Sequence, residues 1–294
     1  MFKALYWKKE DDAVRCQLCP QLCLIHPGKV GLCLVRKNQD GELISLNYGR
    51  ISSKALDPIE KKPLYNFHPG SYILSIGSVG CNLGCPFCQN WQIAHPKDFL
   101  IENPQNIIEQ TTGFVSVADL LKEAIEAKSA GNIGVAYTYN EPFMSYEYIL
   151  DAGKAVREAG LLNVLVTNGY VNPKPLRRLL PFIDAMNIDL KGFTDGVYQQ
   201  LEGHLTPVKK TITAAAESCH VEVTNLLVPG LNDAPEQIED MVKWLAEINS
   251  DIPLHFSRYF PARRYEAAPT PLETLRKAEK IAKNKLKFVY LGNI

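Results

Sequence analysis

The chain has 294 residues, 46% of them apolar, enough for a sizeable core in one large domain or two small ones. Thirty-two basic residues balance thirty-two acidic ones without long runs of either sign, so charge predicts binding to neither nucleic acid nor an anionic membrane. No stretch approaches the ~18 apolar residues that span a bilayer, and the N-terminus lacks the apolar core of a signal peptide. We therefore expect a cytoplasmic protein.

Eight cysteines in a reducing compartment favour metal ligation over disulfides, and seven of them precede residue 90. The first group has the spacing C-x2-C-x3-C-x9-C and consists of Cys16, Cys19, Cys23 and Cys33. Four thiolates satisfy tetrahedral zinc and an auxiliary iron–sulfur cluster equally well, so the metal stays open. His26 offers a substitute ligand, although a solvated loop histidine explains it as well.

Residues 40–70 are expected to form short strands and turns. Asp40-Gly41 is typical of a hairpin turn between residues 34–35 and 43–46. Residues 57–65 contain two prolines and are expected to run extended rather than helical. We therefore divide the chain into a cysteine-rich metal-binding extension, residues 1–70, which covers an edge of a second domain, residues 71–294.

From residue 72 onward, segments typical of buried strands alternate with helical ones. The expected strands are 72–76, 133–138, 163–167, 185–189, 221–228, 254–257 and 287–291. The expected helices are 116–130, 143–159, one that opens at Asn172-Pro173, 238–248 and 271–283. Such alternation predicts an α/β fold with a parallel sheet and right-handed crossovers. A partial (β/α)6 barrel fits it, and a flat doubly wound sheet is the alternative.

A second group of cysteines directly follows the first of these strands. Cys81, Cys85 and Cys88 have the spacing C-x3-C-x2-C, one thiolate fewer than a structural zinc site or an ordinary four-cysteine cluster needs. A [4Fe–4S] cluster held by three cysteines keeps one iron free to bind another molecule. The alternatives are three unrelated core cysteines or part of a zinc knuckle.

Polar residues gather where the later strands end, the edge that carries the active site in β/α barrels. An ordinary structural role explains one or two such residues better than a succession of them. A buried Asp–Lys pair remains an alternative for two of these positions. The residues selected on this basis are Asn140, Glu141, Asn168, Asp189, Lys191, His255 and Arg258.

The cysteine spacing and the order of these strand ends resemble the radical SAM superfamily. That resemblance implies a [4Fe–4S] cluster on Cys81, Cys85 and Cys88 whose open iron binds S-adenosylmethionine (SAM). It further implies that one electron cleaves SAM to methionine and a 5′-deoxyadenosyl radical, which takes a hydrogen atom from a substrate. A non-catalytic iron–sulfur or zinc protein accounts for the cysteines but not for the polar strand ends.

Within that superfamily, the chain looks most like the enzymes that activate glycyl-radical enzymes. Phe87 matches the position that lies against the SAM adenine, and residues 139–142 stand where the family receives the methionyl amino group. Residues 167–169 and 189–191 match further strand-end motifs, and the turn that begins at Val228 matches one near the ribose and adenine. His255 and Arg258 are then expected to touch substrate or SAM, and Lys191 to neutralise the SAM carboxylate.

The chain is more narrowly similar to the radical SAM enzymes of the AmmeMemoRadiSam system, homologues of pyruvate formate-lyase activating enzyme. This similarity is carried by the four-cysteine unit and by residues 57–63 and 88–91. The resemblance implies an electron donor such as ferredoxin or flavodoxin. Two targets stay open: a glycyl residue of a partner enzyme, or a small molecule or other macromolecule.

Overall fold

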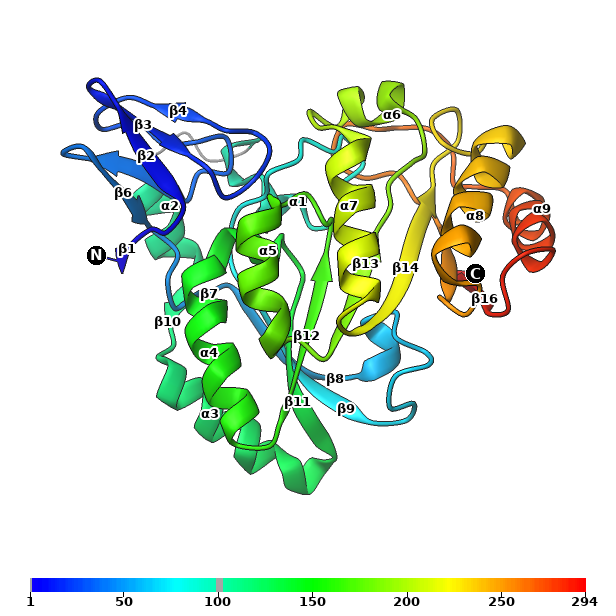
Figure 1. The fold of residues 1–294 in the computed structure, drawn as a ribbon, viewed down its shortest axis with the longest axis horizontal. Helices are drawn as coiled ribbons and strands as arrows, with labels where there is room; N and C mark the ends of the chain where they lie inside the picture. The colour runs from blue at the N-terminus through cyan, green and yellow to red at the C-terminus, as the bar shows by residue number, and fades with distance from the viewer. Residues whose placement is uncertain (1, 99–102) are drawn as a thin grey trace.

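A mixed sheet of eight strands forms the centre of the computed structural model, which describes residues 2–98 and 103–294 (Figure 1). The strand order is β16-β15-β14-β13-β12-β11-β9-β8, with β8 antiparallel at one edge and the others parallel. Their bounds are β8 Ser53–Pro58, β9 Tyr72–Gly77, β11 Asn132–Tyr137, β12 Leu162–Thr167, β13 Ala185–Asp189, β14 His220–Leu227, β15 Leu254–Arg258 and β16 Val289–Gly292.

The seven expected strands are confirmed, with ends shifted by at most two residues. Each parallel strand pairs with the next one along the chain, so the order never reverses. A doubly wound sheet requires such a reversal, and that alternative is therefore wrong. The expected curvature into a partial barrel is a stronger statement and stays a prediction.

Helices connect the parallel strands, and neighbours are in contact as the pairs α3 with α4, α5 with α7, and α8 with α9 (Figure 1). The α-helices of the described chain are α1 Trp91–Ala94, α2 Pro104–Thr111, α3 Val117–Glu126, α4 Tyr146–Glu158, α5 Pro173–Leu179, α6 Asp195–Gln200, α7 Leu205–Ala216, α8 Pro235–Asn249 and α9 Leu272–Lys283. Single 3-10 turns occupy Ile59–Lys61, Pro96–Asp98, Ala127–Ala130, Pro142–Ser145 and Leu180–Phe182.

Local signals explain where α3 begins and where its continuation ends. The Ser116 hydroxyl accepts a hydrogen bond from the Asp119 amide at 3.1 Å, as expected for a capping serine. Gly131 follows the 3-10 turn with φ +85°, a left-handed conformation that favours glycine. The helices bury their apolar faces against the sheet, and Ile212 of α7 and Leu245 of α8 are completely buried. Burial of each such side chain contributes roughly 1.5–3 kcal/mol to the free energy of folding.

The N-terminal residues form two small sheets, β2-β3-β4 and β1-β6-β5, drawn in blue beside α4 and α5 in Figure 1. Turn residues Asp40 and Gly41 both have positive φ, which confirms the hairpin turn, although its first strand is residues 36–39 and not 34–35. The remaining strands are β1 Phe2–Lys3, β2 Trp7–Glu10, β3 Ala13–Cys16, β4 Leu24–Ile25, β5 Arg36–Gln39, β6 Glu42–Ser45, β7 Arg50–Ile51 and β10 Gly113–Phe114. Arg36 and Glu147 of α4 form a buried ion pair at 2.7 Å, which attaches this region to the rest of the chain.

The expectation of an extended segment over residues 57–65 is wrong in its middle. Ile59–Lys61 form a 3-10 turn, because the two prolines flank the turn instead of interrupting it. The preceding strand β8 pairs with β9 and is itself the antiparallel edge strand of the sheet. The division at residue 70 stays a prediction. Within the described residues, no helix is long and apolar enough to cross a membrane.

Candidate active site

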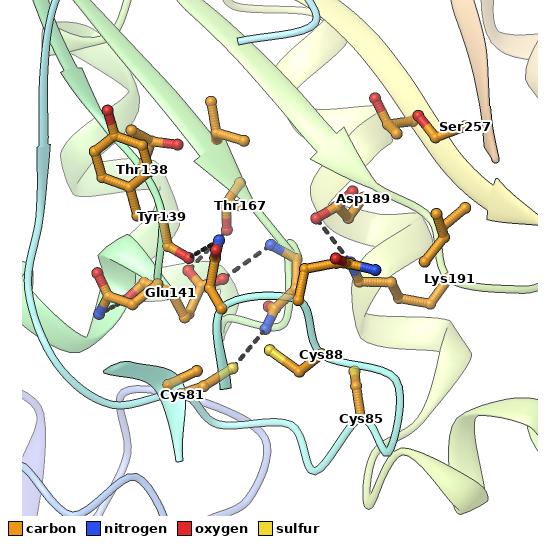
Figure 2. A pocket seen from close by; sticks show the side chains of 18 of the residues that line it. Cys81, Cys85, Cys88, Thr138, Tyr139, Glu141, Thr167, Asp189, Lys191 and Ser257 are labelled. Atoms are coloured by element: carbon orange, nitrogen blue, oxygen red, sulfur yellow. Dashed lines mark hydrogen bonds and ion pairs between the residues drawn. The ribbon is translucent and has the colours of Figure 1, made fainter. Parts of the chain in front are cut away.

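A cavity of about 330 Å³ lies where the carboxyl ends of the parallel strands meet. Its lining comes from the loop after β9 and from the ends of β11 to β15 (Figure 2). Six of the sequence-predicted SAM contacts and all three cysteines of the loop reach it. They are Cys81, Cys85, Cys88, Phe87, Asn140, Glu141, Asn168, Asp189 and Lys191.

We call Cys81, Cys85 and Cys88 the loop cysteines. Burial raises the pKa of all three thiols, to about 12 for Cys85, so a positively charged metal centre is needed to hold them as thiolates. Among the described residues, no three Cys, His, Asp or Glu side chains are placed to hold a metal ion. A cubane does not need such convergence, because its thiolates bind different irons around a common volume. The three buried thiols border one cavity, and this donor set fits a [4Fe–4S] cluster that keeps one iron open.

Glu141 lies beside the loop cysteines, at the end of β11 (Figure 2). Its Oε1 accepts hydrogen bonds from the Thr167 hydroxyl at 2.8 Å and the Phe143 amide at 3.0 Å, and its Oε2 accepts from the Asn168 amide at 2.8 Å. Burial nevertheless raises the pKa of Glu141 to about 7, because these donors only partly replace the lost water. A cationic group in the cavity would favour its ionised form.

Asp189 and Lys191 follow β13 and form an ion pair at 2.8 Å on the opposite wall (Figure 2). Burial alone would lower the pKa of Lys191, but the charges of Asp189 and the nearby cysteines raise it above its usual range. Lys191 thus stays charged. The pair offers one anionic and one cationic group to a zwitterionic ligand.

Two asparagines hold the cysteine loop in place. The Asn140 side chain accepts from the Ser78 amide at 2.8 Å and donates to the Gly80 carbonyl at 3.0 Å. The Asn168 amide group donates to Asn82 Oδ1 at 2.9 Å and to Cys81 Sγ at 3.6 Å. Both residues therefore connect strand ends to the backbone or sulfur of the loop.

The structure does not bring Val228, His255 or Arg258 into the lining of this cavity. His255 is buried and bonds Glu222 Oε2 at 2.6 Å, while Arg258 donates to the Thr270 carbonyl at 2.8 Å. Side chains alternate along a strand, so Arg258 lies on the other face of β15 from Ser257, which lines the cavity. His255 shares the face of Ser257, but its ring packs against Tyr65 and bonds Glu222.

Sequence reasoning did not select Lys61 and Lys62, which also line the cavity. Lys62 is buried and bonds Asp57 Oδ2 at 2.9 Å, and the Tyr139 hydroxyl donates to the same oxygen at 2.7 Å. Burial would raise the pKa of Asp57, but the hydrogen bonds from Tyr139 and Lys62 outweigh it and lower the pKa to about 2. The available signal was a pair of lysines between two prolines, which no strand or helix periodicity explains.

Three cysteines beside a polar pocket at the carboxyl ends of parallel strands are typical of one class of protein. Residues 75–245, more than half of the chain, match the model of the Radical SAM superfamily. The chain belongs to that superfamily, which confirms the resemblance expected from the cysteine spacing. Membership implies a [4Fe–4S] cluster and SAM.

Individual relatives agree with this assignment. The chain is 40% identical over 301 residues to the uncharacterized protein MJ0808 of Methanocaldococcus jannaschii, covering 100% of this chain and 86% of that one. It is 26% identical over 184 residues to the pyruvate formate-lyase 1-activating enzyme of Escherichia coli, covering 59% of this chain and 66% of the relative.

A solved structure shows the same fold. The crystal structure of Streptococcus suis SuiB bound to S-adenosylmethionine matches with a TM-score of 0.56 at 16% identity. The match covers 81% of this chain and 54% of SuiB. At this identity the likeness concerns the fold alone.

Proposed function

We propose that this chain is a radical SAM enzyme that abstracts a hydrogen atom from its substrate. When bound, the cluster and SAM supply the chemistry: one electron cleaves SAM to methionine and a 5′-deoxyadenosyl radical. The observation that carries the proposal is the shared cavity, which joins the loop cysteines to Glu141, Asp189 and Lys191. A non-catalytic iron–sulfur or zinc protein has no need of those charged groups around its cysteines.

The chain's own residues bind and orient SAM in this proposal. Glu141 receives the methionyl amino group, with Asn168 beside it, and Lys191 neutralises the carboxylate while Asp189 holds the lysine. Phe87 packs against the adenine, and the buried cavity wall excludes water from the reacting atoms. Asn140 positions the loop backbone. We assign no contact with SAM or substrate to Val228, His255 or Arg258, since they lie outside the cavity lining.

The substrate proposal follows from the relatives, some of which activate pyruvate formate-lyase. We propose that the radical acts on a glycyl residue of a partner enzyme, and a small molecule or other macromolecule is the second candidate. Lys61 and Lys62 favour a substrate with an acidic or polar group near the reacting carbon, because they add positive charge to the cavity lining. A ferredoxin or flavodoxin serves as electron donor, and the cytoplasm is the proposed location.

The N-terminal cysteine set, Cys16, Cys19, Cys23 and Cys33, carries a separate part of the proposal. All four line a second, smaller cavity. We propose that they bind one metal centre, zinc or an auxiliary iron–sulfur cluster, in an extension to a radical SAM barrel of residues 71–294.

The test is SAM cleavage under anaerobic conditions. The protein is reconstituted with iron and sulfide, mixed with SAM and dithionite, and 5′-deoxyadenosine is measured. We expect product from the wild type and none from Cys85→Ala, while Cys219→Ala, which lies outside both cavities, serves as the matched control. Absence of product from wild-type protein with a full complement of iron would contradict the enzyme proposal.

A further inference from the structure

The segment that follows β15 turns back on itself beside the cysteine loop, and we call its residues 260–265 the strap. Ala262 and Tyr265 form an antiparallel bridge, so the chain reverses direction between them. Arg263 at this reversal has φ +55°, a left-handed conformation that is disfavoured for any residue with a Cβ. Such a conformation persists only where the surrounding contacts fix it. The contacts of Arg263 therefore point to its role.

Hydrogen bonds join the strap to the segment that carries the loop cysteines. The Arg264 amide donates to the Pro86 carbonyl at 2.8 Å, and the Gln89 side chain donates to the Phe260 carbonyl at 3.1 Å. Pro86 and Gln89 each directly follow one of the loop cysteines in the sequence. The strap is therefore bonded to the loop next to two of the proposed cluster ligands.

The guanidinium group of Arg263 makes the most direct of these contacts. Its Nη1 donates to the Cys85 carbonyl at 2.7 Å and to the Gly84 carbonyl at 3.1 Å, while its Nε donates to Asp98 Oδ2 at 2.7 Å. The Arg263 side chain is only 8% exposed. A charge that is shielded from water in this way is screened much less than a surface charge. Arg263 thus brings a buried positive charge to the backbone of a loop cysteine.

The neighbouring Arg264 binds the same aspartate but lies in a different environment. Its Nη2 donates to Asp98 Oδ1 at 2.6 Å, and its side chain is 67% exposed. The two arginines therefore carry equal charges and share one partner, while solvent screens only the charge of Arg264 effectively. This difference makes Arg264 a matched control for Arg263.

We propose that Arg263 is a positioning residue that holds the cysteine loop and makes the cluster on the loop cysteines easier to reduce. Reduction adds one electron from the low-potential carrier, with no bond formed or broken and no proton moved. The cluster becomes more negative, so a buried cation beside the Cys85 backbone stabilises its reduced form more than its oxidised form. Asp98 limits this effect, because it partly neutralises the guanidinium. The inference rests on the cluster of the proposed function.

The midpoint potential of the reconstituted cluster tests the proposal without SAM, by redox titration followed with electron paramagnetic resonance. Arg263→Met should lower the ratio of reduced to oxidised cluster at a fixed potential about tenfold, a shift of about 59 mV for one electron. Arg263→Lys should keep most of the wild-type ratio, since it retains the charge. Arg264→Met should change the ratio less than about twofold, because its charge is screened by solvent. Equal shifts in Arg263→Met and Arg264→Met, or none in either, overturn the proposal.

Asp98→Asn provides a test of opposite sign that stays decisive if Arg263→Met fails to fold or to keep its iron. The amide retains an acceptor oxygen for Arg263 but removes the neutralising charge, so the ratio of reduced to oxidised cluster should rise. A purely structural role of the strap predicts no rise, and an unchanged or lowered ratio overturns the proposal. Wild-type protein that holds the cluster yet forms no 5′-deoxyadenosine contradicts the proposed enzyme function and leaves the role of Arg263 standing.

Discussion

The two cysteine-lined cavities differ in ligand number, size and wall chemistry. The three loop cysteines border about 330 Å³ lined by charged and amide groups, whereas the four N-terminal cysteines enclose about 10 Å³ with largely apolar walls. An incomplete ligand set beside a large polar cavity leaves room for a ligand to reach the metal. A complete ligand set in a small cavity holds its metal and admits little else. The comparison separates a cavity that has room for a further ligand from one that has not.

The largest expected effect comes from separating the two regions at their buried ion pair. Arg36→Met leaves Glu147 as a buried, unpaired charge, so we expect a loss of about 3–5 kcal/mol in the free energy of unfolding. Arg36→Met combined with Glu147→Leu should recover most of that loss, because no charge is left buried. Denaturant unfolding measures the stability of both variants. An Arg36→Met variant as stable as the wild type would show that the ion pair does not attach the N-terminal region.

A smaller effect is expected where the two cysteine groups touch. Gly80→Ala places a Cβ within 2.4 Å of the Cys33 carbonyl at a φ of +96°, so we expect a cost of about 2–4 kcal/mol. Gly160→Ala, also at positive φ but with open space around it, isolates the conformational part of that cost. Thermal unfolding and iron content of the two variants are compared. Equal losses would mean that the contact with Cys33 contributes nothing.

A third, smaller effect is expected from Glu141→Gln in the larger cavity. Replacing a carboxylate by an amide removes a charged hydrogen-bond acceptor, and we expect SAM to bind about 1.5–3 kcal/mol more weakly. Wild-type affinity should rise as pH increases towards about 7 and then level off, because the ionised form of Glu141 receives the amino group. The variant should lack this dependence. Equilibrium binding of SAM, measured from about two pH units below neutrality to about two above it, tests this dependence. If the affinities of wild type and variant changed in parallel with pH, Glu141 would be excluded as the titrating group.

The smallest expected effect on SAM cleavage concerns Glu222, which lies outside the lining of the larger cavity. Burial would raise its pKa, but hydrogen bonds led by His220 and His255 outweigh it and lower the pKa to about 2. The lowered pKa adds stability above the ordinary pKa of 4.5, and this stability is lost as pH falls towards about 2. Glu222→Gln should therefore flatten acid unfolding between these values. Far-ultraviolet circular dichroism follows the acid unfolding. An unchanged acid transition would contradict a stabilising role for the hydrogen bonds between Glu222 and the two histidines.

The predicted site was most accurate where one short stretch carries the information. The loop cysteines, Glu141 and Lys191 were selected from spacing and from their place after a strand, and the cavity lining includes them all. His255 was selected by the same rule, but it is buried against Glu222 and the Tyr65 ring and does not line the cavity. Lys62 was not selected, because the sequence around it predicts neither a strand nor a helix.

Sequence by itself determined the alternation of strands and helices, the turns and the two cysteine spacings, because these depend on residues within one or two turns of chain. Tertiary structure alone decided that Arg36 meets Glu147, that the Cys33 carbonyl touches Gly80, and that the two cysteine cavities differ so much in size. These features join residues far apart in the chain, and their distances are set by how whole elements pack. Spacing predicts which ligands are present, whereas packing decides how much room surrounds them.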